Sequence, residues 1–366
     1  MRPLLLLLVA VSAFAAEKDQ ELIHNEKLYK LFDMAPAGSA ALDRLPALYH
    51  KACSGIFTMD APSPAFRLQD LAFLAPGRKE RLDVYLPYAH PSEISKPKPA
   101  VLFIHGGGFV GGDKGEYRTA SVCTDLTRAG YVVVSCNYIL GPKDKPGVWP
   151  RNIADCRDAV RWMRANSDKL SLDPARIAVA GGSAGGYLAL MVGLSDDKTG
   201  PGGDPNAKHS AAVSAVIDMY GVVNFSKHGK GDVPGVPAEG QAAYLPENQC
   251  DENDPPVLIF HGTDDKIVDI AQSQSMAAAL SRAKTRYDFV TVEGAPHTFD
   301  LRPRSHRWSR VSERWNSSGR TVRHEQFQHF PNPLPPGFST EDILHSRPGL
   351  LEGITLEFLK EALDLR

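Results

Sequence analysis

From residue 81 onward, short runs of apolar and β-branched residues alternate with longer amphipathic segments. Several of these runs are apolar at nearly every position, which is typical of parallel strands covered on both faces. The expected strands are 82–86, 100–106, 131–138, 176–181, 212–220, 256–262 and 287–294, and the expected helices are 115–129, 151–167, 184–194 and 270–284. This alternation predicts an α/β fold with a doubly wound, mostly parallel sheet and helices on both faces.

The repeat defines one large domain with additions. A chain of 366 residues can hold one α/β domain with extensions. We expect residues 16–65 to form an N-terminal extension and residues 66–366 to form the α/β domain. An Arg- and Pro-rich insertion at 300–348 interrupts this domain before a closing helix within 349–366, in which Leu356, Leu359 and Leu363 share one face.

The first residues have the pattern of a secretory signal. Arg2 precedes a leucine-rich run that ends at Ala10, and the small-residue triplet Ala13-Phe14-Ala15 follows it. The apolar run is too short to span a bilayer. These features predict a cleavable signal at residues 1–15, cut after Ala15, and a secreted or periplasmic protein.

Overall composition excludes several classes of partner. The formal net charge is −2, with 43% hydrophobic and 23% charged residues, so neither a nucleic acid nor a membrane surface is indicated. The five cysteines are widely and irregularly spaced, which suggests neither a zinc site nor a disulfide scaffold. Their odd number leaves at least one free thiol within a single chain. No metal-ligand cluster or dinucleotide fingerprint is evident, and we expect no metal and no organic cofactor.

The segment 176–194 contains Gly-x-Ser-x-Gly around Ser183, between an expected strand and an expected helix. Glycines two residues before and after the serine lack side chains that would clash in a tight, strained turn. Such a turn lifts the hydroxyl off the sheet edge above a helix N-terminus, which favours negative charge. A phosphate-binding loop is disfavoured because neither Gly-x-Gly-x-x-Gly nor the P-loop Lys-Ser/Thr pair is present. Ser183 is therefore the predicted nucleophile.

A serine needs a base and an acid, and both candidates follow later strands. Asp265 lies after strand 256–262 and His297 lies after strand 287–294, where a parallel sheet gathers its functional groups. We predict that His297 takes the serine proton and that Asp265 orients the imidazole. Asp264 competes for the acid role, but only one of the adjacent pair can point into the site, and we favour Asp265. His261 lies at a strand end before the acid and is interpreted as structural.

The motif His105-Gly106-Gly107-Gly108-Phe109 follows strand 100–106 and supplies the last requirement of acyl transfer. Backbone N–H groups of glycines can approach a ligand closely, and we expect those of Gly107 and Gly108, with that of Ala184, to bind the oxyanion.

The four motifs are HGGGF at 105–109, GGSAGG at 181–186, HGTDD at 261–265 and GAPHTF at 294–299. With them in place, the chain resembles the α/β-hydrolase superfamily, and specifically the hormone-sensitive-lipase-type esterases that carry His-Gly-Gly-Gly. These include secreted bacterial carbohydrate esterases that remove acetyl or feruloyl groups. The resemblance covers about residues 66–300 and the closing helix. It implies an eight-stranded α/β-hydrolase fold and a catalytic role for the domain at 66–366. It also suggests substrate contacts at His105, Phe109, Tyr187 and Tyr220.

The chain departs from this family pattern in three places. Gly182 stands where many lipase-like members carry Asp, and the segment 218–225 keeps a Tyr-Gly pair without the Pro and Asp that often follow it. The insertion is the largest departure, because residues 300–325 hold seven arginines against three acidic residues, beside several aromatic residues. We hypothesise that it forms a lid or cleft wall that recognises anionic or glycan substrates; a solvated elaboration or an oligomer contact is the alternative.

The expected function is that of a secreted serine carboxylesterase that hydrolyses short acyl or aromatic esters on carbohydrates through an acyl-enzyme. Two alternatives remain open. An amidase or peptidase of the same fold, for example a formamidase-like enzyme, would use the same triad on a different bond. A non-catalytic binding module on a hydrolase scaffold would be expected to lack a triad member.

Overall fold

The computed structural model describes residues 42–43, 45, 66–87, 94–142, 148–195, 206–226, 233, 236–299, 311–316, 321–323 and 350–363. The expected signal at 1–15, nearly all of the extension at 16–65 and most of the insertion at 300–348 lie outside these residues. Their predicted roles stay predictions.

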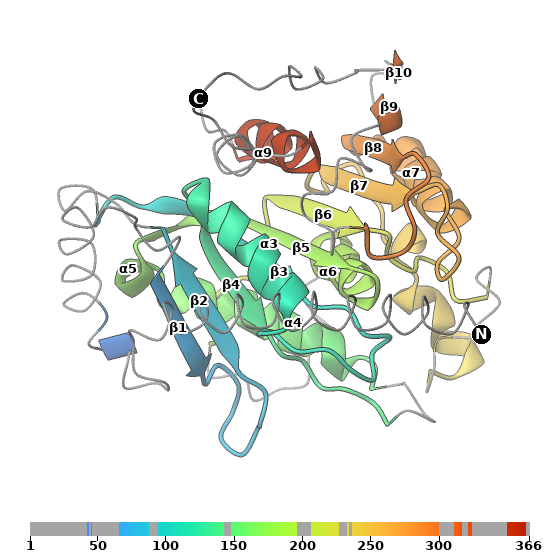
Figure 1. Cartoon of the computed structure of the whole chain (residues 1–366). Coiled ribbons are helices and arrows are strands. Elements are labelled where there is room, and N and C mark those ends of the chain that lie inside the picture. Colours follow the sequence, from blue (N-terminus) through green and yellow to red (C-terminus); the bar gives the residue numbers. More distant parts are fainter. Residues whose placement is uncertain are drawn as a thin grey trace, which may run out of the picture.

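The described chain forms one ten-stranded sheet in the order β1-β2-β4-β3-β5-β6-β7-β8-β9-β10 (Figure 1). Parallel pairing joins the six central strands, which are β4 (Val132–Cys136), β3 (Lys98–Ile104), β5 (Leu172–Gly182), β6 (Ala215–Met219), β7 (Val257–Gly262) and β8 (Tyr287–Val292). The strands β1 (Phe66–Leu71) and β2 (Leu82–Leu86) add to one edge with antiparallel pairing. These eight strands form the expected α/β-hydrolase fold.

Two further strands come from the insertion and extend the sheet beyond the expected eight. The strand β9 (Val311–Asn316) pairs antiparallel with β8, and β10 (Thr321–Arg323) pairs antiparallel with β9. The hypothesis of a lid or cleft wall placed these residues over the active-site mouth, whereas this part of the insertion adds to the sheet edge. The remainder of the insertion lies outside the described residues.

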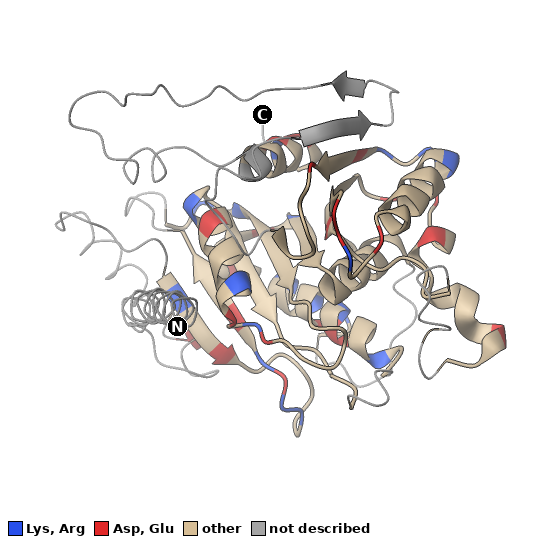
Figure 2. Cartoon of the chain, turned by 45° about the vertical axis from the view of Figure 1, so that its right-hand side comes forward, with Lys and Arg blue, Asp and Glu red and all other residues tan. Residues whose placement is uncertain are grey.

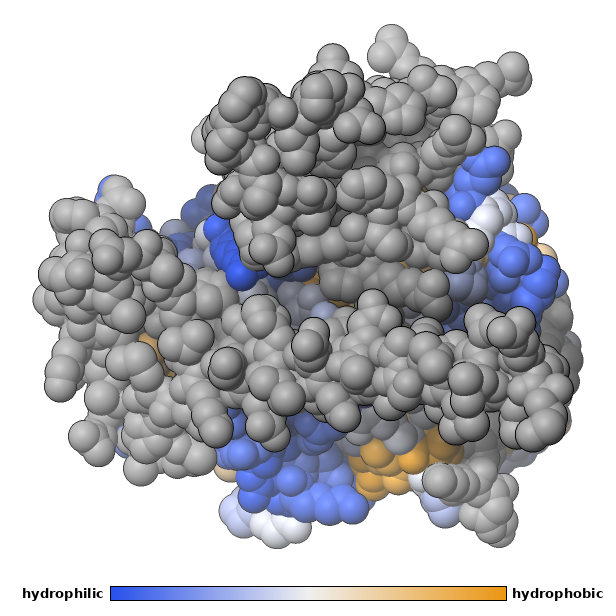
Figure 3. All heavy atoms as spheres, in the orientation of Figure 1, coloured by the Kyte–Doolittle hydropathy of each residue, from blue (hydrophilic) through white to orange (hydrophobic). Residues whose placement is uncertain are grey.

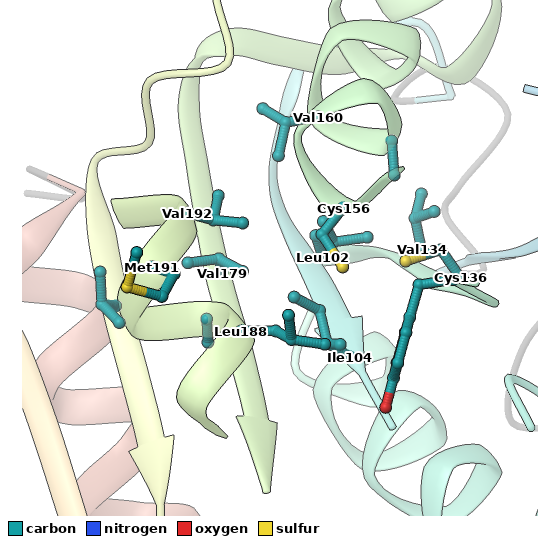
Figure 4. Close-up of a cluster of buried hydrophobic side chains, with 14 of the residues drawn as sticks. Leu102, Ile104, Val134, Cys136, Cys156, Val160, Val179, Leu188, Met191 and Val192 are labelled. Carbon is teal, nitrogen blue, oxygen red and sulfur yellow. The ribbon is translucent and has the colours of Figure 1, made fainter. Parts of the chain in front are cut away.

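Helices cover both faces of the sheet because successive side chains along each central strand point to opposite faces. Along β3, Leu102 and Ile104 belong to one hydrophobic cluster and Val101 and Phe103 to the other. The first cluster packs against α4 (Arg151–Ala165), α6 (Ala184–Leu194) and α7 (Ala271–Ala283), and Figure 4 shows part of it. The second packs against α3 (Tyr117–Arg128) and α9 (Leu350–Ala362). The short helices α5 (Ser167–Leu170), η2 (Ala238–Tyr244) and η3 (Pro246–Asn248) complete the set.

The order of the central strands places two loops beside each other. From β3 the chain crosses to β4 on one side and then returns to β5 on the other side of β3. The loops after β3 and β5 therefore leave the sheet at a point where the winding direction reverses, which is where open α/β sheets bind their ligands. These loops carry the His-Gly-Gly-Gly motif and Ser183.

The first turn of α6 lies against the end of β3 so closely that only glycine fits at residue 185. A Cβ on Gly185 would collide with the carbonyl oxygen of Ile104 and lie 2.7 Å from that of His105. We expect Gly185→Ala to lower the free energy of unfolding by about 3 kcal/mol or more, because backbone atoms on both sides would have to move.

A second glycine provides the matched control for this prediction. Gly353 lies inside α9, and a Cβ there would meet no heavy atom within 4 Å. Gly353→Ala should raise the free energy of unfolding by about 0.5–1 kcal/mol, because alanine favours a helix interior. Urea denaturation of both variants measures the two effects; a loss of stability in Gly185→Ala no greater than about 1 kcal/mol would contradict the close packing.

The described surface is polar and mixed in charge. Figure 2 shows acidic and basic residues interspersed along the chain in that view, and in Figure 3 most of the described surface that faces the viewer is hydrophilic. In the described part of the chain, no helix is both long and apolar enough to cross a membrane. The four cysteines that the structure describes are free thiols, and Cys123, Cys136 and Cys156 are buried.

Candidate active site

Ser183 occupies the single residue between the end of β5 at Gly182 and the start of α6 at Ala184. Its backbone has φ 57° and ψ −122°, a left-handed conformation that is strained for a residue with a side chain. The Ser183 N–H donates to the carbonyl of Met219 at 2.8 Å, which ties the turn to the end of β6. This geometry is the strained strand-to-helix turn that the sequence predicts.

A continuous chain of hydrogen bonds joins the three predicted catalytic side chains. Nε2 of His297 lies 3.0 Å from Oγ of Ser183, and Nδ1 of His297 lies 2.6 Å from Oδ2 of Asp265. An ionised carboxylate only accepts hydrogen bonds, so Nδ1–H donates to Asp265 and Nε2 is left to accept the serine proton. The side chain of His297 is 12% exposed and that of Asp265 is 1% exposed, so the base faces solvent and the acid lies behind it.

Asp265 is held as a buried anion by several donors. Its Oδ1 accepts the N–H groups of Ile267 at 2.8 Å and Val268 at 2.9 Å. Burial alone would raise the pKa of the Asp265 carboxyl, but hydrogen bonds from His261, His297 and these two N–H groups together lower it below its usual range. The carboxylate therefore stays ionised at neutral pH, as a residue that orients an imidazole requires.

The two neighbours that competed for catalytic roles lie elsewhere. Asp264 forms an ion pair with Lys266 at 2.7 Å in which both side chains are exposed. His261 is fully buried, with Nδ1 2.7 Å from Oγ of Ser273 and Nε2 2.9 Å from the carbonyl oxygen of Val268. Nε2–H therefore donates to Val268, and the same nitrogen lies 3.4 Å from Asp265 Oδ2. His261 supports the acid loop, in agreement with its structural interpretation.

The predicted oxyanion donors lie on the two loops that meet at the reversal of the sheet. Gly107 and Gly108 are exposed and have φ values of 111° and 61°, and Gly107 O accepts the N–H of Val110 at 3.2 Å and of Gly111 at 3.0 Å. Ala184 is the first residue of α6, where N–H groups have no acceptor within the helix. The Cβ of Ser183 would lie 3.4 Å from a Cβ on Gly106, so the two loops adjoin.

The four predicted substrate contacts lie behind these loops. Each side chain is at most 5% exposed and packs within the protein, and contact with substrate stays a prediction for all four. His105 stacks on Tyr138 at 4.5 Å and its Nδ1 bonds the carbonyl of Gly106. Burial lowers the pKa of His105 to about 4, so the ring is neutral at pH 7.

Phe109 and Tyr187 belong to an aromatic cluster with Trp149 and Phe225, whose ring centroids lie 4.8–6.0 Å apart. The Tyr187 hydroxyl accepts a hydrogen bond from Trp149 Nε1 and donates one to the carbonyl of Tyr244, both at 2.8 Å. Through Phe109, which directly follows the three glycines, this cluster supports the His-Gly-Gly-Gly loop.

Tyr220, which follows β6, packs against His297, the predicted base. Its ring lies 4.7 Å from that of His297 at an interplanar angle of 65°, and 5.3 Å from that of Phe299. Its hydroxyl accepts a hydrogen bond from Arg118, a buried residue of α3 that the sequence analysis did not single out. The only sequence signal for Arg118 was indirect: Gly182 lacks the Asp of many lipase-like members, which leaves room beside the nucleophile.

Asp218 in β6 is a buried carboxyl group close to the site. Its Oδ1 accepts the N–H of Gly221 at 2.9 Å, and Oδ2 has no hydrogen-bond partner among the described residues. Burial raises the pKa of Asp218 from its ordinary 3.8 to about 7. The folded protein therefore binds a proton here between about pH 4 and 7 that the unfolded chain releases, so this group lowers stability progressively as pH rises through that window.

We expect Asp218→Asn to stabilise the protein relative to wild type, and to do so more at pH 8 than at pH 5. At pH 8 the wild type carries the full cost of a shift of about three pKa units, on the order of 4 kcal/mol, whereas at pH 5 it carries less than half of it. Melting temperatures of both proteins at the two pH values check this. A difference that does not change with pH would contradict a raised pKa at Asp218.

Comparison with known proteins agrees with this geometry. The BD-FAE family, an esterase family, matches residues 82–280, which is more than half of the chain. The chain belongs to the BD-FAE family. The match starts at β2 and ends within α7, so it includes Ser183, Asp265 and the His-Gly-Gly-Gly loop, while His297 follows it.

Curated relatives of this BD-FAE protein are esterases and lipases by name. It is 29% identical over 223 residues to esterase LipC of Mycobacterium tuberculosis, covering 57% of this chain and 54% of LipC. It is 26% identical over 317 residues to lipase 2 of Moraxella sp., covering 71% of each chain. The chain spans little more than half the length of LipC and of the M. tuberculosis proteins LipM and LipQ.

Solved structures similar to this BD-FAE protein are also esterases. A truncated carbohydrate esterase from gut microbiota has a TM-score of 0.57 at 23% identity, covering 66% of this chain and 92% of its own, which shows the shared fold. Thermogutta terrifontis esterase 2, phosphonylated by cyclosarin, has a TM-score of 0.55 at 27% identity, covering 64% of this chain and 85% of its own. Within the described residues, no three His, Cys, Asp or Glu side chains group as they would around a metal ion.

Proposed function

We propose that this protein is an exported serine carboxylesterase that hydrolyses short acyl or aromatic esters attached to carbohydrates. The observation that carries the proposal is the hydrogen-bond chain from Ser183 Oγ through His297 to Asp265, on loops that follow the carboxyl ends of β5, β8 and β7. The esterase names of the relatives support ester hydrolysis.

The proposed reaction has two steps. In the first, His297 Nε2 takes the Ser183 proton while Oγ attacks the ester carbonyl, and the N–H groups of Gly107, Gly108 and Ala184 bind the resulting oxyanion. His297 then gives the proton to the departing alcohol, which leaves an acyl-serine. In the second step, water gives a proton to His297 and attacks the acyl-serine. Collapse of the second oxyanion breaks the bond to Ser183 Oγ, which takes that proton back from His297, and the acid is released.

Several observations support the choice of substrate class. One solved neighbour is named a carbohydrate esterase, and Thermogutta terrifontis esterase 2 is known with propionate and with butyrate bound. The names of these neighbours support small acyl groups and, in one case, a carbohydrate leaving group.

Two assays test this proposal. A fluorophosphonate probe should label the protein stoichiometrically, with Ser183 on the modified peptide. Turnover should be fastest for p-nitrophenyl esters whose acyl chain has two to four carbons. Acetylated or feruloylated oligosaccharides should be hydrolysed faster than aryl amides. An unlabelled protein would refute the acyl-enzyme, and faster cleavage of amides than esters would favour the amidase alternative.

Export is checked by expressing the full chain and sequencing the periplasmic or secreted product, whose first residue should be Ala16.

A further inference from the structure

The guanidinium group of Arg118 lies at the junction of the two loops that form the site. It occupies the space where a side chain at Gly182 would begin: a Cβ there would collide with Nη2 and lie 2.9 Å from Cζ. On the other loop, a Cβ on Gly106 would lie 3.2 Å from Nη1 of Arg118 and 3.4 Å from the Cβ of Ser183. The cation is thus packed against the residue before the nucleophile and against the first glycine of the oxyanion loop.

Arg118 also reaches the catalytic base through one intermediate residue. Its Nη2 donates to the Tyr220 hydroxyl, and its Cζ lies 5.2 Å from the centre of the Tyr220 ring. That ring in turn packs against the imidazole of His297. Asp265 holds the imidazole by a hydrogen bond at Nδ1, and the ring of Tyr220 packs against the imidazole ring. Arg118 therefore reaches His297 through Tyr220, and this series of contacts does not include Asp265.

A buried cation in this place acts on charge as well as on position. Arg118 is 7% exposed, and water screens its field less than it would at the surface. Negative charge develops on the oxyanion during the reaction, and a nearby fixed cation stabilises it. The same cation disfavours the protonated imidazole in the free enzyme. The titratable groups around His297 are Asp265, Ser183 and Tyr220, and those that interact with Arg118 include Glu116 and His105.

We propose that Arg118 is a positioning residue of the esterase site, which holds Tyr220 against the base and supplies a fixed positive charge beside the nucleophile and the oxyanion loop. The inference rests on the proposed function. With glycine at residue 182, the guanidinium group fills the space where a side chain would begin. Arg118 acts through Tyr220 and through its field, without touching the reacting atoms.

Three variants test the two parts of this role with p-nitrophenyl acetate. Arg118→Met removes the charge at similar length, and we expect kcat to fall about 10–100-fold with KM changed less than about threefold. The acid limb of the pH profile of kcat/KM should move about 0.5–1 pH unit to higher pH, because the base is protonated more readily without the cation. Arg118→Lys should return the limb to the wild-type position. Tyr220→Phe should lower kcat about fivefold and leave the limb in place.

The control is Arg128→Met in the last turn of the same helix, where the side chain is 41% exposed and pairs with Asp125 at 3.3 Å. It should leave kcat and the pH profile unchanged. A kcat within twofold of wild type in Arg118→Met would overturn the inference. So would equal losses in the Met and Lys variants without movement of the acid limb, which would show that the side chain only fills space. If Arg118→Met does not fold, a wild-type kcat in Tyr220→Phe is the overturning result.

The same assays separate this inference from the proposed function. A wild-type protein without esterase activity, or a Ser183→Ala variant with full activity, refutes the proposed function itself. A wild type that is active, a Ser183→Ala variant that is inactive and an unchanged Arg118→Met variant refute only the role of Arg118.

Discussion

Ser183→Ala should lower kcat for p-nitrophenyl acetate by about 10⁴–10⁶-fold, because it removes the hydroxyl that is hydrogen-bonded to His297 and would form the acyl intermediate. The loss should appear in kcat, with KM changed little, since the serine hydroxyl acts on the reacting carbon. A small residual rate should persist, because the N–H groups of Gly107, Gly108 and Ala184 can still bind an oxyanion during attack by water. Steady-state kinetics with purified protein measure the loss, and labelling by the fluorophosphonate probe should vanish with it.

A second serine provides a closely matched control. Ser171 also has a positive φ, of 50°, although its ψ of 40° differs from the −122° of Ser183, and it follows the short helix α5 outside the site. Ser171→Ala should leave kcat unchanged and give a change in melting temperature similar to that of Ser183→Ala. Retention of more than about a hundredth of the wild-type kcat by Ser183→Ala would mean that another residue is the nucleophile.

The second large effect is expected at the acid. Asp265→Asn should lower kcat by about 10⁴-fold, because an asparagine can present its NH₂ group to Nδ1 and favour the tautomer whose Nε2 carries a proton. That tautomer cannot accept the proton of Ser183. The pKa of Asp265 lies below its usual range, so the wild-type carboxylate stays ionised and the loss should be the same from pH 6 to pH 9.

Asp264→Asn is the control for this variant, since it makes the same chemical change one residue away. The Asp264 carboxylate is exposed and pairs with Lys266, so the variant should keep kcat within about twofold of wild type. A large loss in Asp264→Asn together with a small one in Asp265→Asn would reverse the assignment of the acid.

The triad could be predicted from sequence because each member is fixed by local signals. Ser183 has its strand, glycines and helix within one segment, and Asp265 and His297 each follow an apolar run directly. Parallel strands bring their carboxyl ends to one edge, so local pattern was enough to place these groups together. Chain order fits Asp264 and Asp265 equally, and the structure supplies the physical reason for Asp265 in the two N–H groups that hold Oδ1.

The features that sequence reasoning missed depend on how distant segments dock. Arg118 reaches Gly182 and Tyr220 only because α3 packs where it does, and no local pattern marks that arginine among the others of the chain. The aromatic cluster likewise joins Phe109, Trp149, Tyr187 and Phe225 from four separate segments. The strands β9 and β10 lie in an arginine-rich stretch without an apolar run, and they were therefore assigned to an insertion rather than to the sheet.

The pairing of β9 with β8 changes the surroundings of the strand that precedes His297, the predicted base. In an eight-stranded sheet β8 would be the outermost strand, whose free edge frays and whose amide hydrogens exchange readily. Here β8 has hydrogen-bonded neighbours on both sides, and His297 follows its last residue by only a few positions. We therefore expect this part of the insertion to stiffen the strand that leads to the imidazole. Deuterium uptake in β8 should be slow in the full chain and fast when residues 311–323 are removed.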